Sequence, residues 1–196
     1  FGLMRTIPGM VVMSPADDIE AKAMVRAAYE HVGPVYMRFG RSAVPVVFDE
    51  NTYKFEIGKG AVLASGSDVT IAATGIMVEQ ALAAREILAS EGISAEVINI
   101  ATIKPIDDKP IDKEILVKAS KETGAIVTAE EHNIIGGLGS AVCEVLCEDA
   151  PCVVERVGIS DTFGRSGSVE ELLEYYHLTP AEIVSKAKLA MKKAGK

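Results

Sequence analysis

Residues 69–100 read "VTIAATGIMVEQALAAREILASEGISAEVINI", and this stretch decides the fold. The apolar run "VTIAATG" and the segment Ala95–Ile100 each have the length and composition of a buried strand. Between them, Met77–Ser90 is predicted to be a helix that Gly92 ends. A strand, a helix and another strand in this order are typical of α/β proteins with a parallel sheet.

The same alternation continues to the C-terminus. The predicted elements are a helix at Asp112–Glu122 with Gly124 at its end, a strand at Ala125–Ala129, a helix at Leu138–Glu148, a strand at Cys152–Val157, and helices at Val169–Tyr176 and Pro180–Ala194, the last capped by Thr179. Pro105 and Pro110 mark the loop after the strand Ala95–Ile100. The pattern predicts the α/β class, as a three-layer α/β/α sandwich with a mixed, mostly parallel sheet.

One antiparallel member is expected at the start of this sheet. The run "AVLASG" (residues 61–66) is a predicted strand, and the turn Ser65–Asp68 connects it to "VTIAATG". Such a short turn predicts that these two strands are antiparallel neighbours.

The N-terminal segment contains a smaller α/β unit. Met10–Met13 and Val35–Phe39 are predicted strands, joined by a helix at Ile19–Val32 and therefore expected to be parallel. The apolar face of the helix is expected to consist of Ala21, Met24, Val25 and Ala28.

Capping residues mark the start of that helix. Ser14 is the expected N-cap, Pro15 suits the first helical position, and Asp17 stands at the capping-box distance. After the second strand, Ser42–Lys59 mixes Pro, Asp, Asn and Gly with short apolar pieces, which predicts a linker that ends in a strand.

Composition limits the classes of function. The chain has 196 residues and a net charge of −8, which disfavours nucleic-acid and anionic-membrane binding because phosphates would meet a repulsive field. No run approaches the ~18 apolar residues that a membrane span needs. Cys143, Cys147 and Cys152 form no disulfide framework, so we expect reduced thiols in a cytoplasmic protein. Cys143 and Cys147 allow a metal site, but buried packing is the usual role of such residues.

A glycine-rich motif, "EEHNIIGGLGSAV" (residues 130–142), lies between a predicted strand and a predicted helix. Gly137 and Gly139, followed by the strand "CVVE" that ends in Glu155, have nearly the order of a dinucleotide-binding site. Val142 replaces the third glycine, and six residues separate the strand from the first glycine, which opposes this interpretation.

The acidic end of the same strand has its own alternatives. Glu130 and His132 share a face because strand residues alternate, so they are candidates for a metal site or for acid–base chemistry, whereas Glu131 points the other way. The alternative is that these polar side chains cap the following helix or contact a partner chain.

Arg38 and Arg41 lie in "VYMRFGRSAVP", at the end of a predicted parallel strand. A guanidinium group suits bidentate binding of phosphate or carboxylate. The alternative for both residues is a surface salt bridge.

Together these motifs resemble the transketolase family over essentially the whole chain. The run "LMRTIPGMVVMSPADDIEAKAMVRAAYEHVGPVYMRFGRSAVPV" is similar to the end of the transketolase pyrimidine-binding domain. The segments "VTIAATGIMVEQALAAREILASEGISAEVINIATIKPID", "EEHNIIGGLGSAV" and "VGISDTFGRSGSVEELLEYYHLT" resemble the C-terminal domain. The likeness is strongest to the C-terminal subunit of split bacterial transketolases, truncated at its start. It implies a remnant of the pyrimidine-binding domain at residues 1–45, a linker at 46–59 and a C-terminal domain at 60–196.

The resemblance also implies an activity. Transketolases use thiamine diphosphate and a divalent metal to transfer a two-carbon ketol unit between sugar phosphates. Their substrate-phosphate arginine corresponds to Arg41, with Arg38 a weaker candidate. The resemblance implies that the cofactor-activating glutamate and the aromatic cofactor pocket lie upstream of Phe1, and that the diphosphate and metal sites lie in a separate N-terminal domain. We therefore expect no cofactor or metal on the fragment and no activity of the fragment alone. Homodimerisation is also expected.

Other functions stay open. Deoxyxylulose phosphate synthase and the β-chains of 2-oxoacid dehydrogenases share this domain, although the arginine pattern favours transketolase. A non-catalytic assembly module is the alternative of a different class. In the family, the glycine motif lies outside the cofactor site, so we interpret Gly136, Gly137 and Gly139 as permitting a tight loop.

Overall fold

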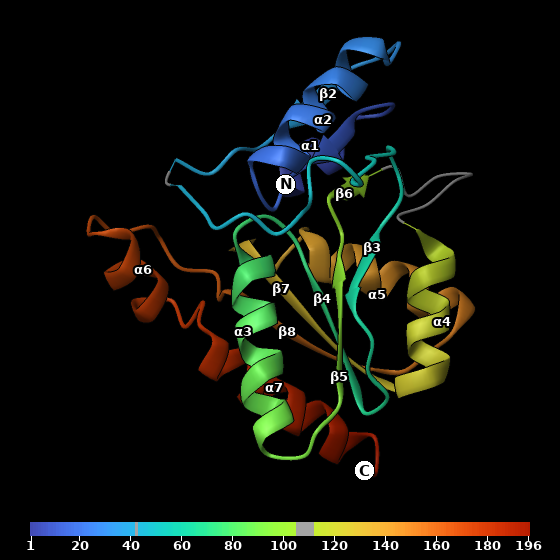
Figure 1. Cartoon of the computed structure of the whole chain (residues 1–196), viewed down its shortest axis with the longest axis vertical. Coiled ribbons are helices and arrows are strands. Elements are labelled where there is room, and N and C mark those ends of the chain that lie inside the picture. The colour runs from blue at the N-terminus through green and yellow to red at the C-terminus, as the bar shows by residue number, and fades with distance from the viewer. Residues whose placement is uncertain (42, 105–111) are drawn as a thin grey trace.

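A five-stranded sheet forms the centre of the computed structural model, which describes residues 1–41, 43–104 and 112–196 (Figure 1). In spatial order its strands are β3 (Ala61–Ala64), β5 (Ala95–Asn99), β4 (Val69–Ala73), β7 (Ala125–Asn133) and β8 (Val153–Ile159). Strands β5, β4, β7 and β8 are parallel, and β3 is antiparallel to β5. The predicted mixed, mostly parallel sheet is confirmed.

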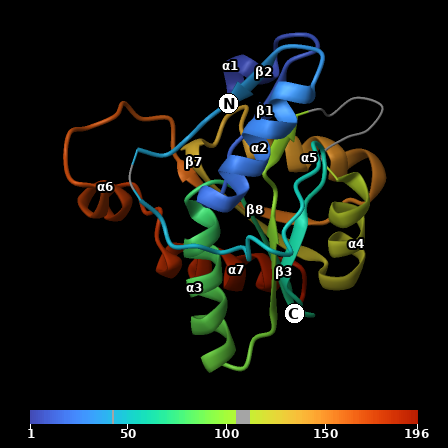
Figure 2. The same cartoon turned by 45° about the horizontal axis from the view of Figure 1, so that its top comes forward.

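Helices cover both faces of this sheet. On one face lie α3 (Met77–Ser90) and α7 (Pro180–Lys193), and on the other lie α4 (Lys113–Thr123) and α5 (Leu138–Asp149) (Figures 1 and 2). The short helix α6 (Val169–Tyr175) projects from the sandwich beside α3 (Figure 1). The predicted three-layer α/β/α sandwich is therefore confirmed.

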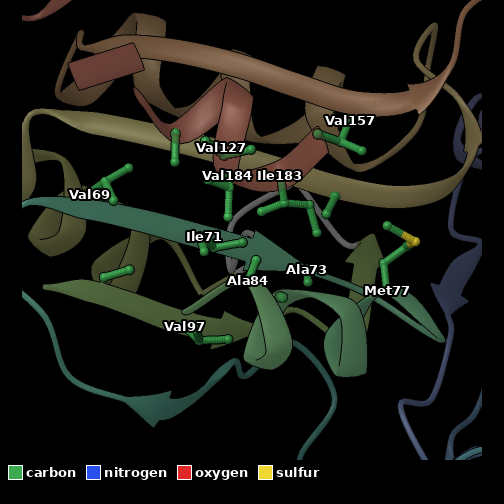
Figure 3. Close-up of a cluster of buried hydrophobic side chains, with 14 of the residues drawn as sticks. Val69, Ile71, Ala73, Met77, Ala84, Val97, Val127, Val157, Ile183 and Val184 are labelled. Carbon is green, nitrogen blue, oxygen red and sulfur yellow. The ribbon is translucent and has the colours of Figure 1, made fainter. Parts of the chain in front are cut away.

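Alternation along the strands builds the two cores. Val69, Ile71 and Ala73 of β4 face α3 and α7, where they pack in a fully buried cluster (Figure 3). Ala72, between them, belongs to the opposite cluster with α4 and α5. Burying each large aliphatic side chain contributes about 1.5–3 kcal/mol, so both faces of the sheet stabilise the fold.

Several helix ends match their predictions. Helix α3 begins and ends at the predicted residues, and Gly124 ends α4 in the left-handed conformation with φ 60°. The Thr179 side chain accepts a hydrogen bond from the amide of Glu182 and caps α7 as expected. These signals are local, which explains why they could be seen in the sequence.

The predicted hairpin between the first two strands of the sheet is wrong. Strand β3 pairs with β5, and β5 separates it from β4. Residues 65–68 pass the start of β5 instead of turning tightly, and the amides of Ser67 and Asp68 donate to the carbonyl of Ser94. A Cβ on Gly66 would lie 2.2 Å from the Ala95 carbonyl carbon, so this crossing requires glycine.

A second sheet joins the N-terminal segment to the rest of the chain. Within the described residues it contains β2 (Val35–Met37), β1 (Val11–Met13) and β6 (Thr102–Lys104). Strands β1 and β2 are parallel, as predicted, and are connected by α2 (Asp18–Glu30). The three residues of β6, which pair antiparallel with β1, were not predicted because so short a run carries little pattern.

The start of α2 differs from the prediction. Asp17, not Ser14, is the N-cap, and it accepts a hydrogen bond from the amide of Glu20. The Ser14 hydroxyl instead donates to the carbonyl of Arg38. Val25 was assigned to the apolar face but is 47% exposed, because α2 buries only a narrow face.

Three further differences are local. The four-residue helix α1 (Gly2–Arg5) was not predicted, and no strand occurs in the described part of the linker before Ala61. Strand β7 extends to Asn133, which is four residues beyond its predicted end at Ala129. The predicted loop with Pro105 and Pro110 lies outside the described residues. None of the described helices is both long and apolar enough to cross a membrane.

Candidate functional site

The candidate site lies where the connections of the large sheet change direction. From β4 the chain crosses one face of the sheet through α3 to reach β5. From β7 it crosses the opposite face through α5 to reach β8, in the opposite direction along the strand order. The carboxyl ends of two such strands form the crevice where α/β proteins usually bind ligands. Thr74–Ile76 follows β4 here, and Glu130–His132 lies near the carboxyl end of β7, just before its last residue, Asn133.

The N-terminal segment covers this crevice. Phe1, Ser14, Arg38 and Gly40 line it from above, and Glu131 lines it from β7. Only about 10 Å³ of space is left between them, which is room for about one water molecule. The position that usually holds a ligand is therefore filled by the protein's own side chains.

Arg38 joins the two sides of the crevice. Its guanidinium forms an ion pair with the Glu131 carboxylate, with Nη2 and Oε2 3.0 Å apart, and Nη1 donates to the Glu131 main-chain carbonyl. The Phe1 ring stacks on the same guanidinium, 5.1 Å from Cζ to the ring centroid. The structure thus contains the salt bridge that was one of the two alternatives for this residue.

Arg41 lies three residues further on and is exposed. It lines a separate cavity of about 430 Å³ between the loop after β2, the start of α3 and α6. Glu79, Glu131 and Glu170 line the same cavity. Within the described part of the chain, no ion pair involves Arg41.

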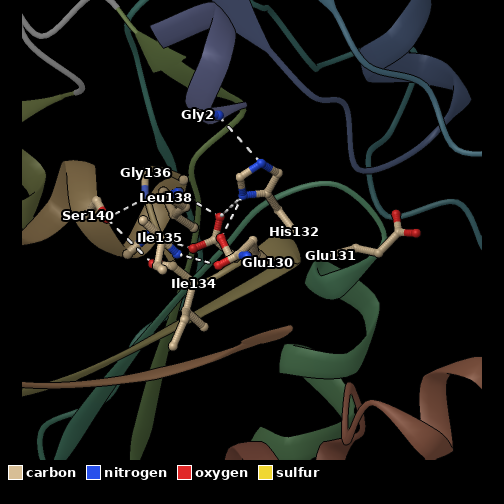
Figure 4. Close-up of polar contacts among 12 residues, drawn as sticks. Gly2, Glu130, Glu131, His132, Ile134, Ile135, Gly136, Leu138 and Ser140 are labelled. Carbon is tan, nitrogen blue, oxygen red and sulfur yellow. Dashed lines mark hydrogen bonds and ion pairs between the residues drawn. The ribbon is translucent and has the colours of Figure 1, made fainter. Parts of the chain in front are cut away.

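The glycine motif binds a carboxylate of its own chain. Glu130 is fully buried, and its two carboxylate oxygens accept hydrogen bonds from the amides of Leu138 (2.7 Å) and Gly139 (2.9 Å) at the start of α5 (Figure 4). Burial raises the pKa of Glu130, while these two amides favour its charged form. A Cβ on Gly137 would lie 1.9 Å from Glu130 Oε2, so only glycine leaves room for the carboxylate.

This arrangement opposes the dinucleotide interpretation. A pyrophosphate would need the amides at the N-terminus of α5, and Glu130 already uses two of them. Glu155, the expected ribose ligand, forms ion pairs with Lys186 and Lys193. One sequence argument against this interpretation was wrong, because β7 extends to Asn133 and only Ile134 and Ile135, not six residues, separate the strand from Gly136. The occupied amides and the ion pairs of Glu155 are therefore the evidence against it.

His132 shares a face with Glu130, as the alternation predicts, and Glu131 points away from both (Figure 4). Nδ1 of His132 lies 2.6 Å from the Asn133 carbonyl, and Nε2 accepts a 3.4 Å hydrogen bond from the Gly2 amide. These partners place the proton on Nδ1, and burial lowers the pKa of the ring. His132 is therefore a neutral contact between β7 and the N-terminal segment.

Arg5 completes this contact. Its Nη1 donates to the carbonyls of Gly136 (2.8 Å) and Gly137 (3.2 Å), and its Nη2 pairs with Glu144 on α5 at 2.6 Å. The sequence analysis missed Arg5, because its partners lie more than 130 residues away. The glycine motif thus joins α1 to α5.

A second group that was missed connects α2 to the linker and to β5. The buried Glu20 carboxylate accepts hydrogen bonds from the Ala16 amide (2.7 Å), the Asn99 side chain (2.8 Å) and the Tyr53 hydroxyl. Burial raises its pKa to about 6. A glutamate on the inner face of a helix was the available sequence signal, because such a group needs buried partners.

The described residues offer no metal centre. No group of three or more His, Cys, Asp or Glu side chains among them is arranged to hold an ion. Cys143, Cys147 and Cys152 are free thiols, and burial raises the pKa values of Cys143 and Cys152. The metal interpretations of the cysteines and of Glu130 with His132 therefore have no support in the structure.

Comparison with known families covers both parts of the chain. The description "Transketolase, pyrimidine binding domain" matches residues 1–47, and "Transketolase, C-terminal domain" matches residues 58–183. The second match alone covers more than half of the chain.

Similar proteins include subunits and larger enzymes. The chain is 46% identical over 193 residues to a protein of Methanocaldococcus jannaschii described as a transketolase C-terminal section, covering 97% of this chain and 58% of that protein. It is 45% identical over 185 residues to a 6-deoxy-6-sulfo-D-fructose transketolase subunit of Clostridium sp. strain MSTE9, covering 94% and 56%. It is 43% identical over 187 residues to 1-deoxy-D-xylulose-5-phosphate synthase of Heliobacterium modesticaldum, covering 94% and 28%.

A solved structure has the same fold. It is described as a split gene transketolase in an inactive beta4 tetramer, and it superposes with a TM-score of 0.92 at 49% identity over 97% of this chain and 61% of that one. Since the family descriptions, the relatives and the fold agree, the chain belongs to the transketolase family.

Proposed function

We propose that this chain is the C-terminal part of a thiamine-diphosphate-dependent transketolase, which transfers a two-carbon ketol unit between sugar phosphates together with an N-terminal subunit. The observation that carries the proposal is the combined match to the pyrimidine-binding and C-terminal domains in one chain. The chain spans somewhat more than half the length of the transketolase relatives and of the split-gene structure. A subunit role is supported by the descriptions of two relatives as a C-terminal section and as a transketolase subunit.

The transketolase family depends on thiamine diphosphate, and the described residues do not fit that group or its metal. They contain no cluster of metal ligands, and both oxygens of the buried Glu130 already bind amides of α5. We therefore assign cofactor binding to the assembled enzyme and derive no catalytic step through the cofactor. For the same reason we propose that the chain alone is inactive. We also propose that it consists of a pyrimidine-domain part at 1–45, a linker at 46–59 and a C-terminal domain at 60–196.

Arg41 is the residue that we assign to the substrate, as the ligand of its terminal anionic group. It is exposed beside a cavity of about 430 Å³, whereas the guanidinium of Arg38 is already bound to Glu131. The relative named for 6-deoxy-6-sulfo-D-fructose suggests that the anionic group is a phosphate or a sulfonate. Both present oxygens to which a guanidinium can donate two hydrogen bonds.

Substitution of Arg41 in the enzyme assembled with its N-terminal subunit tests this assignment. Arg41→Ala should raise KM for ribose 5-phosphate about ten- to a hundredfold, because a charge-assisted hydrogen bond contributes about 1.5–3 kcal/mol. KM for free ribose should change less than about twofold. Arg26→Ala, which removes an exposed arginine from α2, is the matched control. Equal changes in KM for the two acceptors would refute the role of Arg41.

Mixing tests the subunit role itself. The chain alone should give no ketol transfer, and activity should appear when the C-terminal subunit with its whole pyrimidine-binding domain is mixed with the N-terminal subunit. No activity in a mixture that forms a complex would favour the non-catalytic assembly module. Product analysis with pyruvate and glyceraldehyde 3-phosphate separates the deoxyxylulose phosphate synthase alternative, which the 43% identical relative keeps open. Sedimentation of the chain alone tests the proposed homodimer.

A further inference from the structure

The loop that carries Arg41 is held at both ends. At its start, the Arg38 amide donates to the carbonyl of Met13 (2.9 Å), and the Arg38 carbonyl accepts a hydrogen bond from Ser14 Oγ (3.2 Å). At its end, the amides of Val47 and Phe48 both donate to one carboxylate oxygen of Asp17, each at 2.8 Å. Arg41 lies between these two anchors in the sequence, three residues after Arg38.

The anchor at Arg38 also crosses to the C-terminal part of the chain. Its guanidinium binds both the carboxylate and the main-chain carbonyl of Glu131 on β7. The two side chains are 30% and 39% exposed, so the pair is only partly screened by water. Next to it, a Cβ on Gly40 would lie 3.3 Å from Ile76 Cγ2, so the loop passes close against the residue that precedes α3.

The same pair controls the charge of the cavity. Glu79, Glu131 and Glu170 line it together with Arg41, and three carboxylates would repel an anionic substrate. Arg38 pairs with Glu131 and so offsets the charge of one of these three carboxylates. Two effects of Glu131 can therefore be separated: it holds the loop, and it adds a negative charge.

We propose that the Arg38–Glu131 pair is a positioning element that sets Arg41 for the anionic end of the substrate, a role that rests on the proposed function. Arg38 itself then does not bind the substrate. The acidic motif at residues 130–132 acquires two different roles. Glu130 caps α5, and Glu131 connects the C-terminal part to the substrate loop.

The test compares Glu131→Ala, Glu131→Gln and Glu170→Ala in the assembled enzyme. Glu131→Ala should raise KM for ribose 5-phosphate at least about threefold, with kcat and the KM for free ribose within about twofold. Glu131→Gln keeps an oxygen that can accept from Arg38, so it should restore most of the affinity. Glu170→Ala removes a carboxylate without a described ion pair and should lower KM or leave it unchanged.

These variants distinguish positioning from charge. If Glu131 acted only by its charge, Glu131→Ala and Glu131→Gln would both lower KM for the phosphorylated acceptor, which would overturn the proposal. Equal changes for both acceptors would also overturn it. Denaturation midpoints of the three variants establish that each is folded. If Glu131→Ala does not fold, Glu131→Gln serves as the test. A lower KM of Glu131→Gln for ribose 5-phosphate then refutes the proposal.

A double-mutant cycle separates this inference from the assignment of Arg41. If Glu131 acts through Arg41, Glu131→Ala should have no further effect on KM in an Arg41→Ala background. A phosphate-selective effect of Arg41→Ala together with an unchanged effect of Glu131→Ala in that background would overturn the inference alone. No phosphate-selective effect of Arg41→Ala would overturn the proposed function and the inference with it.

Discussion

Replacement of Glu130 by alanine should destabilise the chain substantially. The carboxylate is fully buried and accepts hydrogen bonds from the amides of Leu138 and Gly139, which have no other described partner at the start of α5. Alanine would leave both amides without an acceptor and would remove an anion from the helix N-terminus.

The magnitude follows from two opposing contributions. Leaving a buried donor unpaired costs about 1–3 kcal/mol, so the two amides together amount to about 2–6 kcal/mol. Burial disfavours the charged carboxylate, which raises the pKa of Glu130. The alanine variant no longer buries this charge, and that gain offsets part of the cost of the two unpaired amides. We expect Glu130→Ala to lower the free energy of unfolding by about 2–4 kcal/mol. Glu130→Gln, which keeps one acceptor, should lose about half as much.

Urea denaturation of the purified chain, followed by circular dichroism, measures both changes. The slope of the transition should be unchanged, so the loss should appear as a shift of the midpoint. Glu148→Ala is the matched control, because it removes an exposed carboxylate from the same helix and should stay within about 0.5 kcal/mol. A loss below about 1 kcal/mol for Glu130→Ala would show that the amides find other partners and would refute the reasoning.

Two further predictions concern stability. Burial raises the pKa of Glu20 from 4.5 to about 6, so the folded chain holds this proton more tightly than the unfolded chain. The free energy of unfolding should therefore fall by about 2 kcal/mol in total as pH rises from about 3.5 to about 7. Denaturation of Glu20→Gln across this range should lack that fall, and an identical pH profile in both proteins would contradict the assignment. Gly66→Ala should cost about 2 kcal/mol or more, because its Cβ would lie 2.2 Å from the main chain of Ala95. Gly164→Ala, which meets no atom within 4 Å, should be nearly neutral by the same denaturation measurement, and similar losses for the two variants would contradict the steric argument.

Local signals in the sequence were sufficient for the elements but not for every strand pairing. The bounds of α3 and the cap of α7 depend on neighbouring residues, so they could be predicted. The partner of β3 depends on a crossover in which the chain passes the start of β5, and the four residues of the turn carry no information about it. The short length of this turn favoured a hairpin between β3 and β4. In the structure Gly66 packs against the start of β5 instead, and β3 pairs with β5.

The candidate site shows the same division. Residue type and strand position identified Arg38 and Arg41 as candidates. The carboxylate that distinguishes them, Glu131, lies 93 residues from Arg38 in sequence, so its ion pair could not be predicted. The structure therefore adds the information that one guanidinium is bound and the other is exposed.

The glycine motif resembles a phosphate loop because the two share a physical requirement. Both present the free amides of a helix N-terminus to an anion, and both need glycine where the anion approaches the main chain. The difference is the source of the anion, which here is Glu130 at the end of the strand that leads into the motif. His132 and Arg5 then connect the same region to α1, so the motif joins the C-terminal part of the chain to the N-terminal segment that carries Arg41.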